Sequence, residues 1–275
     1  MKEIALPLHP APARVWIAVV ALGICAFSIV TSELAPVGML SALAADFHQT
    51  ESGVGLAVTA YGWVGALAAL LSGAMPTRIS RKALLGGLYG ATACIITAHF
   101  AAFTYIEPLL INLQGVPATA LSGLLLLSGV SGLLGNVIAG KLIDRHLKGL
   151  IFAALLLSGG ALALLGAARL APLPFCFSGL LLALWGTGIA IVFVGLQTWL
   201  LRSAGAVAQP ASAIYVAIFN AAIGTGAFVG GQLIASAGLS GMVWLAAGIM
   251  VGSTLLIALL KAPLPGQIGA ATAGA

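Results

Sequence analysis

The sequence has 275 residues, of which 61% are hydrophobic and only 6% are charged. Soluble domains average about 25% charged residues, so this composition, with a mean hydropathy of +1.16, excludes an ordinary soluble fold. The net charge of +5 does not predict nucleic-acid binding, because the basic residues lie in short turns with no interleaved aromatic platform.

Continuous apolar runs of about 20 residues, the length that crosses about 30 Å of hydrocarbon, follow one another along the chain. Lipid offers no partner for backbone N–H and C=O groups, so such runs must form helices or a closed barrel, and unbroken runs favour helices. We predict an all-α, polytopic bundle of about eight membrane-spanning helices. Their expected ranges are 15–40, 53–75, 84–106, 118–140, 149–168, 175–200, 211–235 and 239–260.

The basic residues predict the orientation of this bundle. With a cytoplasmic N-terminus, ten of the 11 lysines and arginines lie in cytoplasmic segments, and Arg169 alone lies on the other side. This distribution follows the positive-inside rule and places both termini in the cytoplasm. The ten cytoplasmic residues are Lys2, Arg14, Arg78, Arg81, Lys82, Lys141, Arg145, Lys148, Arg202 and Lys261.

Ionisable residues within a membrane span are costly, so each one is a functional candidate. Glu33 lies in the outer part of the first expected helix, and Pro36 removes a backbone donor beside it and loosens the helix. A carboxylate in a cleft that opens to water can take up and release a proton. Glu33 is therefore a candidate proton carrier, with an inert partner at the outer interface as the alternative.

Five further polar residues fall within or beside the expected spans. His99 lies near the middle of the third span, with Tyr105 and Glu107 at its outer end. The alternative for His99 is a core histidine whose hydrogen bonds are satisfied. The alternative for Glu107 is a carboxylate that caps an exposed loop. Gln197 and Asn220 lie in the sixth and seventh spans, where amides serve either as partners for a polyol or as hydrogen bonds between helices.

Small residues and cysteines indicate packing rather than chemistry. Glycines at four-residue spacing in the segment 224–231 predict close approach of helix backbones. Cys25, Cys94 and Cys176 show no paired spacing, so we expect neither a disulfide nor a metal site. The segment 129–132 (GVSG) matches an intramembrane serine protease motif, but no later span supplies a histidine base. We expect no enzyme activity and no cofactor.

Residues 31–40 (TSELAPVGML) and 97–108 (TAHFAAFTYIEP) together resemble the major facilitator superfamily, within it the bacterial sugar efflux transporters and drug:proton antiporters. Residues 31–40 (TSELAPVGML) resemble the first-helix signature of the sugar efflux transporters. Residues 97–108 (TAHFAAFTYIEP) are similar to the start of the second half, the seventh helix of that fold. Trp185-Gly186, Gly195-Leu-Gln197 and the segment 219–231 are similar to its tenth and eleventh helices.

Two short basic segments resemble the cytoplasmic loops that connect the halves of such transporters. The first, 73–85, matches the loop between helices two and three, although Thr77 stands where the family pattern has an aspartate. The second, 140–149, matches the copy of that loop in the other half. The matching residues are Gly73, Arg78, Arg81 and Lys82 in the first loop and Gly140, Asp144, Arg145 and Lys148 in the second.

Only two apolar runs separate these loops, whereas the family pattern places them six helices apart. The resemblance therefore implies family helices one and two joined directly to helices seven through twelve, with about 120 residues missing, at about 20 per span plus loops. The expected organisation is an N-terminal helix pair over 1–82, a six-helix bundle over 83–262 and a disordered tail over 263–275.

The resemblance implies proton-coupled efflux of a sugar or similar small polar or drug-like solute, by alternating access across the bacterial inner (plasma) membrane. Glu33 would exchange protons, while His99, Gln197 and Asn220 would contact the solute. Tyr105 and Glu107 would lie near the outer gate. The alternative is a transport-inactive remnant or a membrane partner protein, in which a homodimer would cover faces that once met the missing helices.

Overall fold

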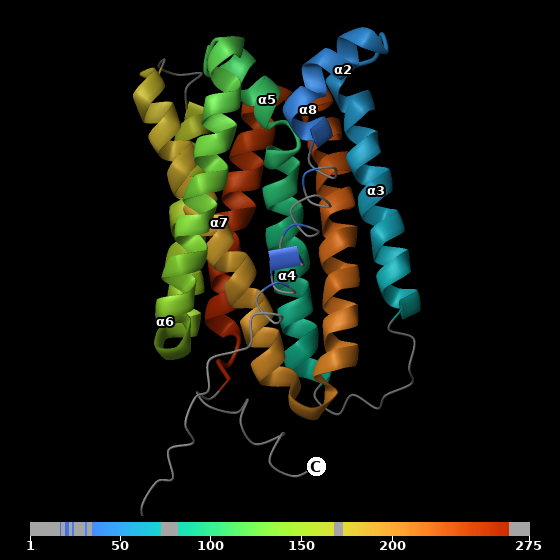
Figure 1. The fold of residues 1–275 in the computed structure, drawn as a ribbon, viewed down its shortest axis with the longest axis vertical. Coiled ribbons are helices and arrows are strands. Elements are labelled where there is room, and N and C mark those ends of the chain that lie inside the picture. Colours follow the sequence, from blue (N-terminus) through green and yellow to red (C-terminus); the bar gives the residue numbers. More distant parts are fainter. Residues whose placement is uncertain are drawn as a thin grey trace, which may run out of the picture.

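The computed structural model describes residues 35–72, 82–167 and 173–263, together with the single residues Ile17, Val20, Ala21, Ile24 and Thr31. The described chain is 93% helical and contains no strand, as the uninterrupted apolar runs predict. Its long helices run side by side along the longest axis of the molecule (Figure 1).

The long helices cover the ranges of the second to the eighth expected span, with α6 and α8 each covering two of them. In chain order they are η1 (Ala35–Met39), α2 (Leu40–Asp46), α3 (Glu51–Ser72), α4 (Lys82–Phe103), α5 (Ile106–Pro108), η2 (Leu109–Leu113), α6 (Ala118–Gly166), α7 (Phe175–Ala204), η4 (Gly205–Val207) and α8 (Ala208–Leu259). The first expected span falls largely outside the described residues. Its last part is the short helix pair η1 and α2, which reaches beyond the predicted end at residue 40.

Helices α6 and α8 each fold back on themselves at one non-helical residue. The break in α6 is at His146 (φ −131°, ψ 30°), so the predicted turn over 140–149 is narrower than expected. The break in α8 is at Gly238 (φ 72°, ψ 174°), between two predicted spans. Gln114, just before α6, donates its amide N–H to the carbonyl of Leu165 near the end of α6, which places both ends of α6 at the same end of the bundle.

Four stretches of the described chain are long and apolar enough to cross a membrane. They are Glu51–Leu71, Leu85–Phe103, Ala118–Gly166 and Phe175–Leu259, and the last of these includes both α7 and α8. An unbroken helix of about 20 residues already spans the hydrocarbon, so the two longest stretches exceed one crossing. The protein is a bundle of apolar helices suited to a membrane.

The first piece of α8 lies between α3 and α4, with backbones in close contact. A Cβ atom on Gly224 would lie 2.6 Å from the carbonyl oxygen of Thr59 in α3. A Cβ atom on Gly230 would lie 2.5 Å from the carbonyl oxygen of Ala101 in α4. The close approach predicted for the segment 224–231 is therefore confirmed, because only glycine leaves room for both neighbours.

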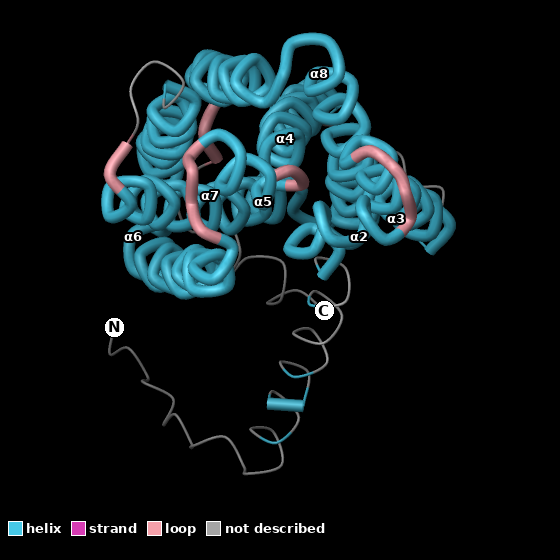
Figure 2. The backbone as a smooth tube through the Cα atoms, turned by 90° about the horizontal axis from the view of Figure 1, so that it is seen from above, coloured by secondary structure: helices cyan, strands magenta, loops and turns pink. Residues whose placement is uncertain are grey.

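Helix α7 packs against α6 in the same way, on the other side of α4. A Cβ atom on Gly186 would lie 2.7 Å from the carbonyl oxygen of Ser128, and the hydroxyl of Thr187 donates to the carbonyl of Ser131 at 3.0 Å. Seen from above, α6 and α7 lie on one side and α2 and α3 on the other, with α4 and α8 between them (Figure 2).

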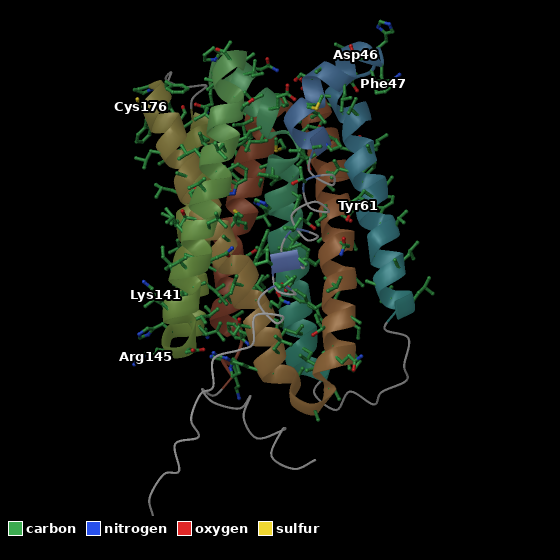
Figure 3. The ribbon with its side chains drawn as sticks, viewed as in Figure 1. Asp46, Phe47, Tyr61, Lys141, Arg145 and Cys176 are labelled. Atoms are coloured by element: carbon green, nitrogen blue, oxygen red, sulfur yellow. The ribbon has the colours of Figure 1, made fainter. Side chains whose placement is uncertain are left out.

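The charged side chains of the described chain separate to the two ends of the bundle. Figure 3 shows Asp46 at one end and Lys141 and Arg145 at the other. Glu107 accepts the backbone N–H of Ser41 in α2, the helix that ends at Asp46, whereas Arg202 pairs with Asp144 next to Arg145. One end is therefore acidic and the other basic.

Candidate functional site

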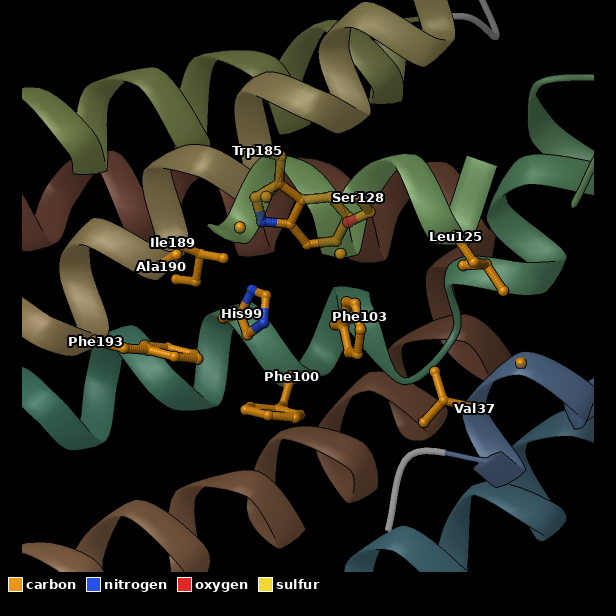
Figure 4. Close-up of a pocket in the computed structure, with 14 residues that line it drawn as sticks. Val37, His99, Phe100, Phe103, Leu125, Ser128, Trp185, Ile189, Ala190 and Phe193 are labelled. Atoms are coloured by element: carbon orange, nitrogen blue, oxygen red, sulfur yellow. The ribbon is translucent and has the colours of Figure 1, made fainter. Parts of the chain in front are cut away.

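A cavity of about 380 Å³ lies between η1, α4, α6 and α7. Figure 4 shows that His99 extends from α4 toward Trp185 on α7. The cavity is lined by Val37, Gly38, His99, Phe100, Phe103, Leu125, Ser128, Gly129, Gly132, Trp185, Gly186, Ile189, Ala190 and Phe193. We call it the His99 cavity.

The imidazole of His99 is enclosed by aromatic rings and only 4% exposed. It stacks on Phe103, with ring centroids 5.2 Å apart and planes at 22°. Trp185 and Phe193 of α7 present their rings edge to face at 5.4 and 5.5 Å, and Phe100 does so at 4.9 Å. Such edge-to-face and stacked contacts hold the imidazole in one orientation.

Two buried polar atoms of this cavity have no hydrogen-bond partner among the described residues. They are Nδ1 of His99 and Nε1 of Trp185. Buried polar groups in proteins are almost always hydrogen-bonded, because an unpaired one loses its water without compensation. Both atoms are buried within the cavity wall, so a solute in the cavity would pair with them only after a small shift of the two side chains. This pair of atoms is the strongest sign of a binding site in the described chain.

Within the described part of the chain, Ser128 is the only other lining residue with a polar side chain. The rest of the wall is aliphatic, aromatic or glycine, so the cavity accepts an apolar body and offers few polar contacts. This combination is typical of small-molecule sites, which are mostly apolar with a few placed polar groups.

The other two predicted solute contacts lie elsewhere. Gln197 is exposed on α7, one turn beyond Phe193, and does not line the His99 cavity. The side-chain amide of Asn220 donates to the carbonyl of Val216 in its own helix at 2.9 Å. Its Oδ1 would lie 2.9 Å from a Cβ atom on Gly65 of α3. Asn220 therefore lies between α3 and α8, away from the cavity.

Tyr105 and Glu107, the predicted gate residues, both join elements at the acidic end. Tyr105 is fully buried, and its hydroxyl donates to the carbonyl of Ala227 in α8 at 2.9 Å. Glu107 is 6% exposed, and its carboxylate accepts the backbone N–H of Ser41 in α2 at 2.9 Å. Glu107 does not cap an exposed loop. This hydrogen bond connects α5, which contains Glu107, to α2.

The predicted proton carrier and most of the first basic loop lie outside the described residues. These are Glu33, Gly73, Arg78 and Arg81. Lys82 is the first residue of α4, and its side chain also lies outside the described part.

The second basic loop forms the break in α6 and ties three helices together. Asp144 pairs with Arg202 in the last turn of α7. Nζ of Lys148 donates to the carbonyls of Ala258 and Leu260 at the end of α8, at 2.7 and 2.8 Å. Arg145 and Gly140 are exposed on α6.

Sequence reasoning missed the aromatic residues of the site and Arg202. The signal was present in the spacing: Phe103 follows His99 by four positions, and Trp185, Ile189 and Phe193 recur every four positions along α7. Residues so spaced share one face of a helix. The same apolar spacing is found in any buried helix, however, so it does not single out a cavity.

Among the residues that the structure describes, no three His, Cys, Asp or Glu side chains come together in a way that could hold a metal ion. The hydroxyl of Ser131, in the protease-like motif, donates to the carbonyls of Leu127 and Ser128 of its own helix. No family model matches the chain.

Proposed function

We propose that this protein carries a small molecule across a membrane by alternating access and binds it in the His99 cavity. The observation that carries the proposal is a pair of buried polar atoms, His99 Nδ1 and Trp185 Nε1, in a largely apolar cavity; neither atom has a hydrogen-bond partner among the described residues. The volume of about 380 Å³ falls within the range of small-molecule pockets, about 300–1,000 Å³.

The lining favours a solute with a flat apolar body and one or two hydrogen-bonding groups. A sugar carries several hydroxyls, and each one that loses water without gaining a partner weakens binding. Among the described residues, the cavity offers only His99, Ser128 and Trp185 as polar side chains. The resemblance of residues 31–40 and 97–108 to sugar efflux transporters keeps sugars in the test panel, but the walls suit a drug-like solute better.

The proposed membrane arrangement has eight spans with both termini in the cytoplasm. The breaks at His146 and Gly238 support the count, since each divides a helix too long for one crossing into two pieces. The basic residues at the α6 break and the end of α7 support the orientation through the positive-inside rule. Glu33 is proposed to exchange the coupling proton, on the strength of the first-helix resemblance.

Binding in the cavity is tested by changing His99 and by following solute binding to the purified protein in detergent. Because Phe keeps an aromatic ring but has no ring nitrogen, we expect His99→Phe to weaken binding of a flat aromatic dye with one hydrogen-bonding group about tenfold, the worth of one hydrogen bond of about 1.4 kcal/mol. His48→Asn is the matched control: His48 is exposed and has φ 51°, which asparagine tolerates. Equal affinities of wild type and His99→Phe for the dye would show that the His99 cavity is not the binding site.

Transport is tested in proteoliposomes with an imposed pH gradient and a panel of labelled sugars and aromatic solutes. We expect flux of an aromatic solute above that of empty vesicles, lost in Glu33→Gln and retained in His48→Asn. Flux that is unchanged in Glu33→Gln would contradict its role as the proton carrier.

A transport-inactive membrane partner is the second candidate, and one observation favours it. Helix α3 is the least covered of the apolar stretches, with Val64, Leu67 and Leu71 between 62% and 79% exposed. These residues form a face that another membrane protein, or a second copy, can cover. Binding without flux of any solute in the panel would favour this candidate over transport.

A further inference from the structure

A second cavity, of about 430 Å³, lies at the basic end of the bundle, away from His99. Its walls come from the break in α6, the last turn of α7 and the segment after α8, and they include Asp144, Arg145, His146, Lys148, Arg202 and Pro263. We propose that this basic cavity binds the phosphate of an anionic phospholipid headgroup. The proposal is independent of the transport activity.

The basic cavity keeps an excess of positive charge. Arg145, Lys148 and Arg202 face a single carboxylate, Asp144, and that carboxylate already pairs with Arg202. Arg145 is exposed and has no ion pair within the described chain. A guanidinium presents several N–H donors in a planar fork that matches phosphate oxygens. Arg145 is therefore the cation most available to a ligand.

The other two cations are held in place before any ligand arrives. Lys148 donates two of its three ammonium hydrogens to the carbonyls of Ala258 and Leu260, which leaves one for a further acceptor. Arg202 is only 6% exposed and is fixed by Asp144. Preorganised donors favour binding because little side-chain freedom is lost when the ligand arrives.

The position of the basic cavity favours a lipid over a soluble phosphate, although the recognised chemistry is the same. The cavity lies where the apolar stretch Phe175–Leu259 ends, at the level where a bilayer presents its headgroups. Leu142, Leu201 and Leu259 are 44%, 39% and 73% exposed close to these residues in sequence. They offer apolar surface to acyl chains, which a soluble anion cannot use. Basic pockets between membrane helices are a recurring site for anionic headgroups.

The proposal is tested by native mass spectrometry of the full chain in neutral detergent, titrated with dioleoylphosphatidylglycerol, dioleoylphosphatidylcholine or glycerol 3-phosphate. We expect phosphatidylglycerol to bind at least fivefold more tightly than phosphatidylcholine, and Arg145→Gln to weaken it about fivefold, the effect of one basic residue near an anionic lipid. Lys141→Gln is the matched control, because Lys141 is exposed one turn earlier on α6 and does not line the cavity. That variant should bind phosphatidylglycerol within twofold of wild type.

A second variant keeps the test decisive if Arg145→Gln proves unstable. Gly149 also lines the basic cavity, and a Cβ atom there would meet nothing within 4 Å. Gly149→Glu should therefore fold normally, place a carboxylate at the cavity and lower phosphatidylglycerol affinity at least tenfold.

Two outcomes would overturn the proposal. Equal losses in Arg145→Gln and Lys141→Gln would show general attraction to a basic surface with no defined site. Glycerol 3-phosphate bound as tightly as phosphatidylglycerol, with the same dependence on Arg145, would assign the cavity to a soluble anion.

Discussion

At the scale of single residues, the close contacts between helices depend on glycines that leave no room for a Cβ atom. Gly230 of α8 lies against α4, and a Cβ atom there would meet the carbonyl oxygen of Ala101 at 2.5 Å and Tyr105 Cε2 at 2.9 Å. Gly252, later in the same helix, would meet nothing within 4 Å. Glycine is therefore needed for packing at position 230 but not at position 252, and substitution by alanine at each position distinguishes the two.

We predict that Gly230→Ala lowers the free energy of unfolding by about 1–3 kcal/mol, because an extra methyl forces apart two packed backbones. Gly252→Ala should change it by less than about 1 kcal/mol or raise it, since alanine is the better helix former. Unfolding in mixed micelles of increasing SDS content measures both. Equal effects of the two substitutions would contradict the close contact of α8 with α4.

At the scale of elements, the short helix α2 is held by a carboxylate from elsewhere in the chain. Glu107 accepts the backbone N–H of Ser41, one of the first N–H groups of α2, which have no partner within their own helix. Glu51 accepts the hydroxyl of the same serine at 3.0 Å. Ser41 is thus bound by two carboxylates: Glu107 accepts its backbone N–H and Glu51 accepts its side-chain hydroxyl.

We predict that Glu107→Ala speeds hydrogen exchange of the Ser41 amide about tenfold, which corresponds to the loss of one hydrogen bond of about 1.4 kcal/mol. Glu51→Ala should change that rate by less than about twofold, because the bond it removes goes to the hydroxyl. Exchange measured by mass spectrometry over peptides covering 40–46 distinguishes them. Unchanged exchange in Glu107→Ala would show that α2 is held by its apolar contacts alone.

At the scale of the whole molecule, the separation of charge gives the bundle a direction. Phe47 follows α2 at the acidic end and is 67% exposed, whereas Lys141 lies at the basic end (Figure 3). Basic segments stay on the cytoplasmic side of a membrane. The proposed orientation therefore places Phe47 outside and Lys141 inside.

This orientation is tested by single-cysteine variants that also carry Cys25→Ala, Cys94→Ala and Cys176→Ala. In intact cells, a membrane-impermeant maleimide should label Phe47→Cys fully and Lys141→Cys by less than about a tenth as much. Lys141→Cys should label only after the cells are permeabilised. The reverse pattern would show that the basic end faces outward.

The sequence by itself determined the class of structure and the closeness of some contacts. In lipid the backbone must satisfy its own hydrogen bonds, which leaves helices or a closed barrel, and long unbroken apolar runs favour helices. The glycines of the segment 224–231 indicated where backbones would touch, since no other residue leaves that space. These features depend on local composition, so they can be predicted from the sequence alone.

Only the tertiary structure decided which polar residues meet. His99 and Gln197 were equal candidates in the sequence, yet His99 lies beside Trp185 in a cavity while Gln197 is exposed. In helices that are apolar all round, periodicity does not mark the inward face. The partners of a side chain then depend on helices distant in sequence, as in the pairing of Arg202 with Asp144. Helix formation is a local property of this chain, but the choice of neighbours is made by packing across the bundle.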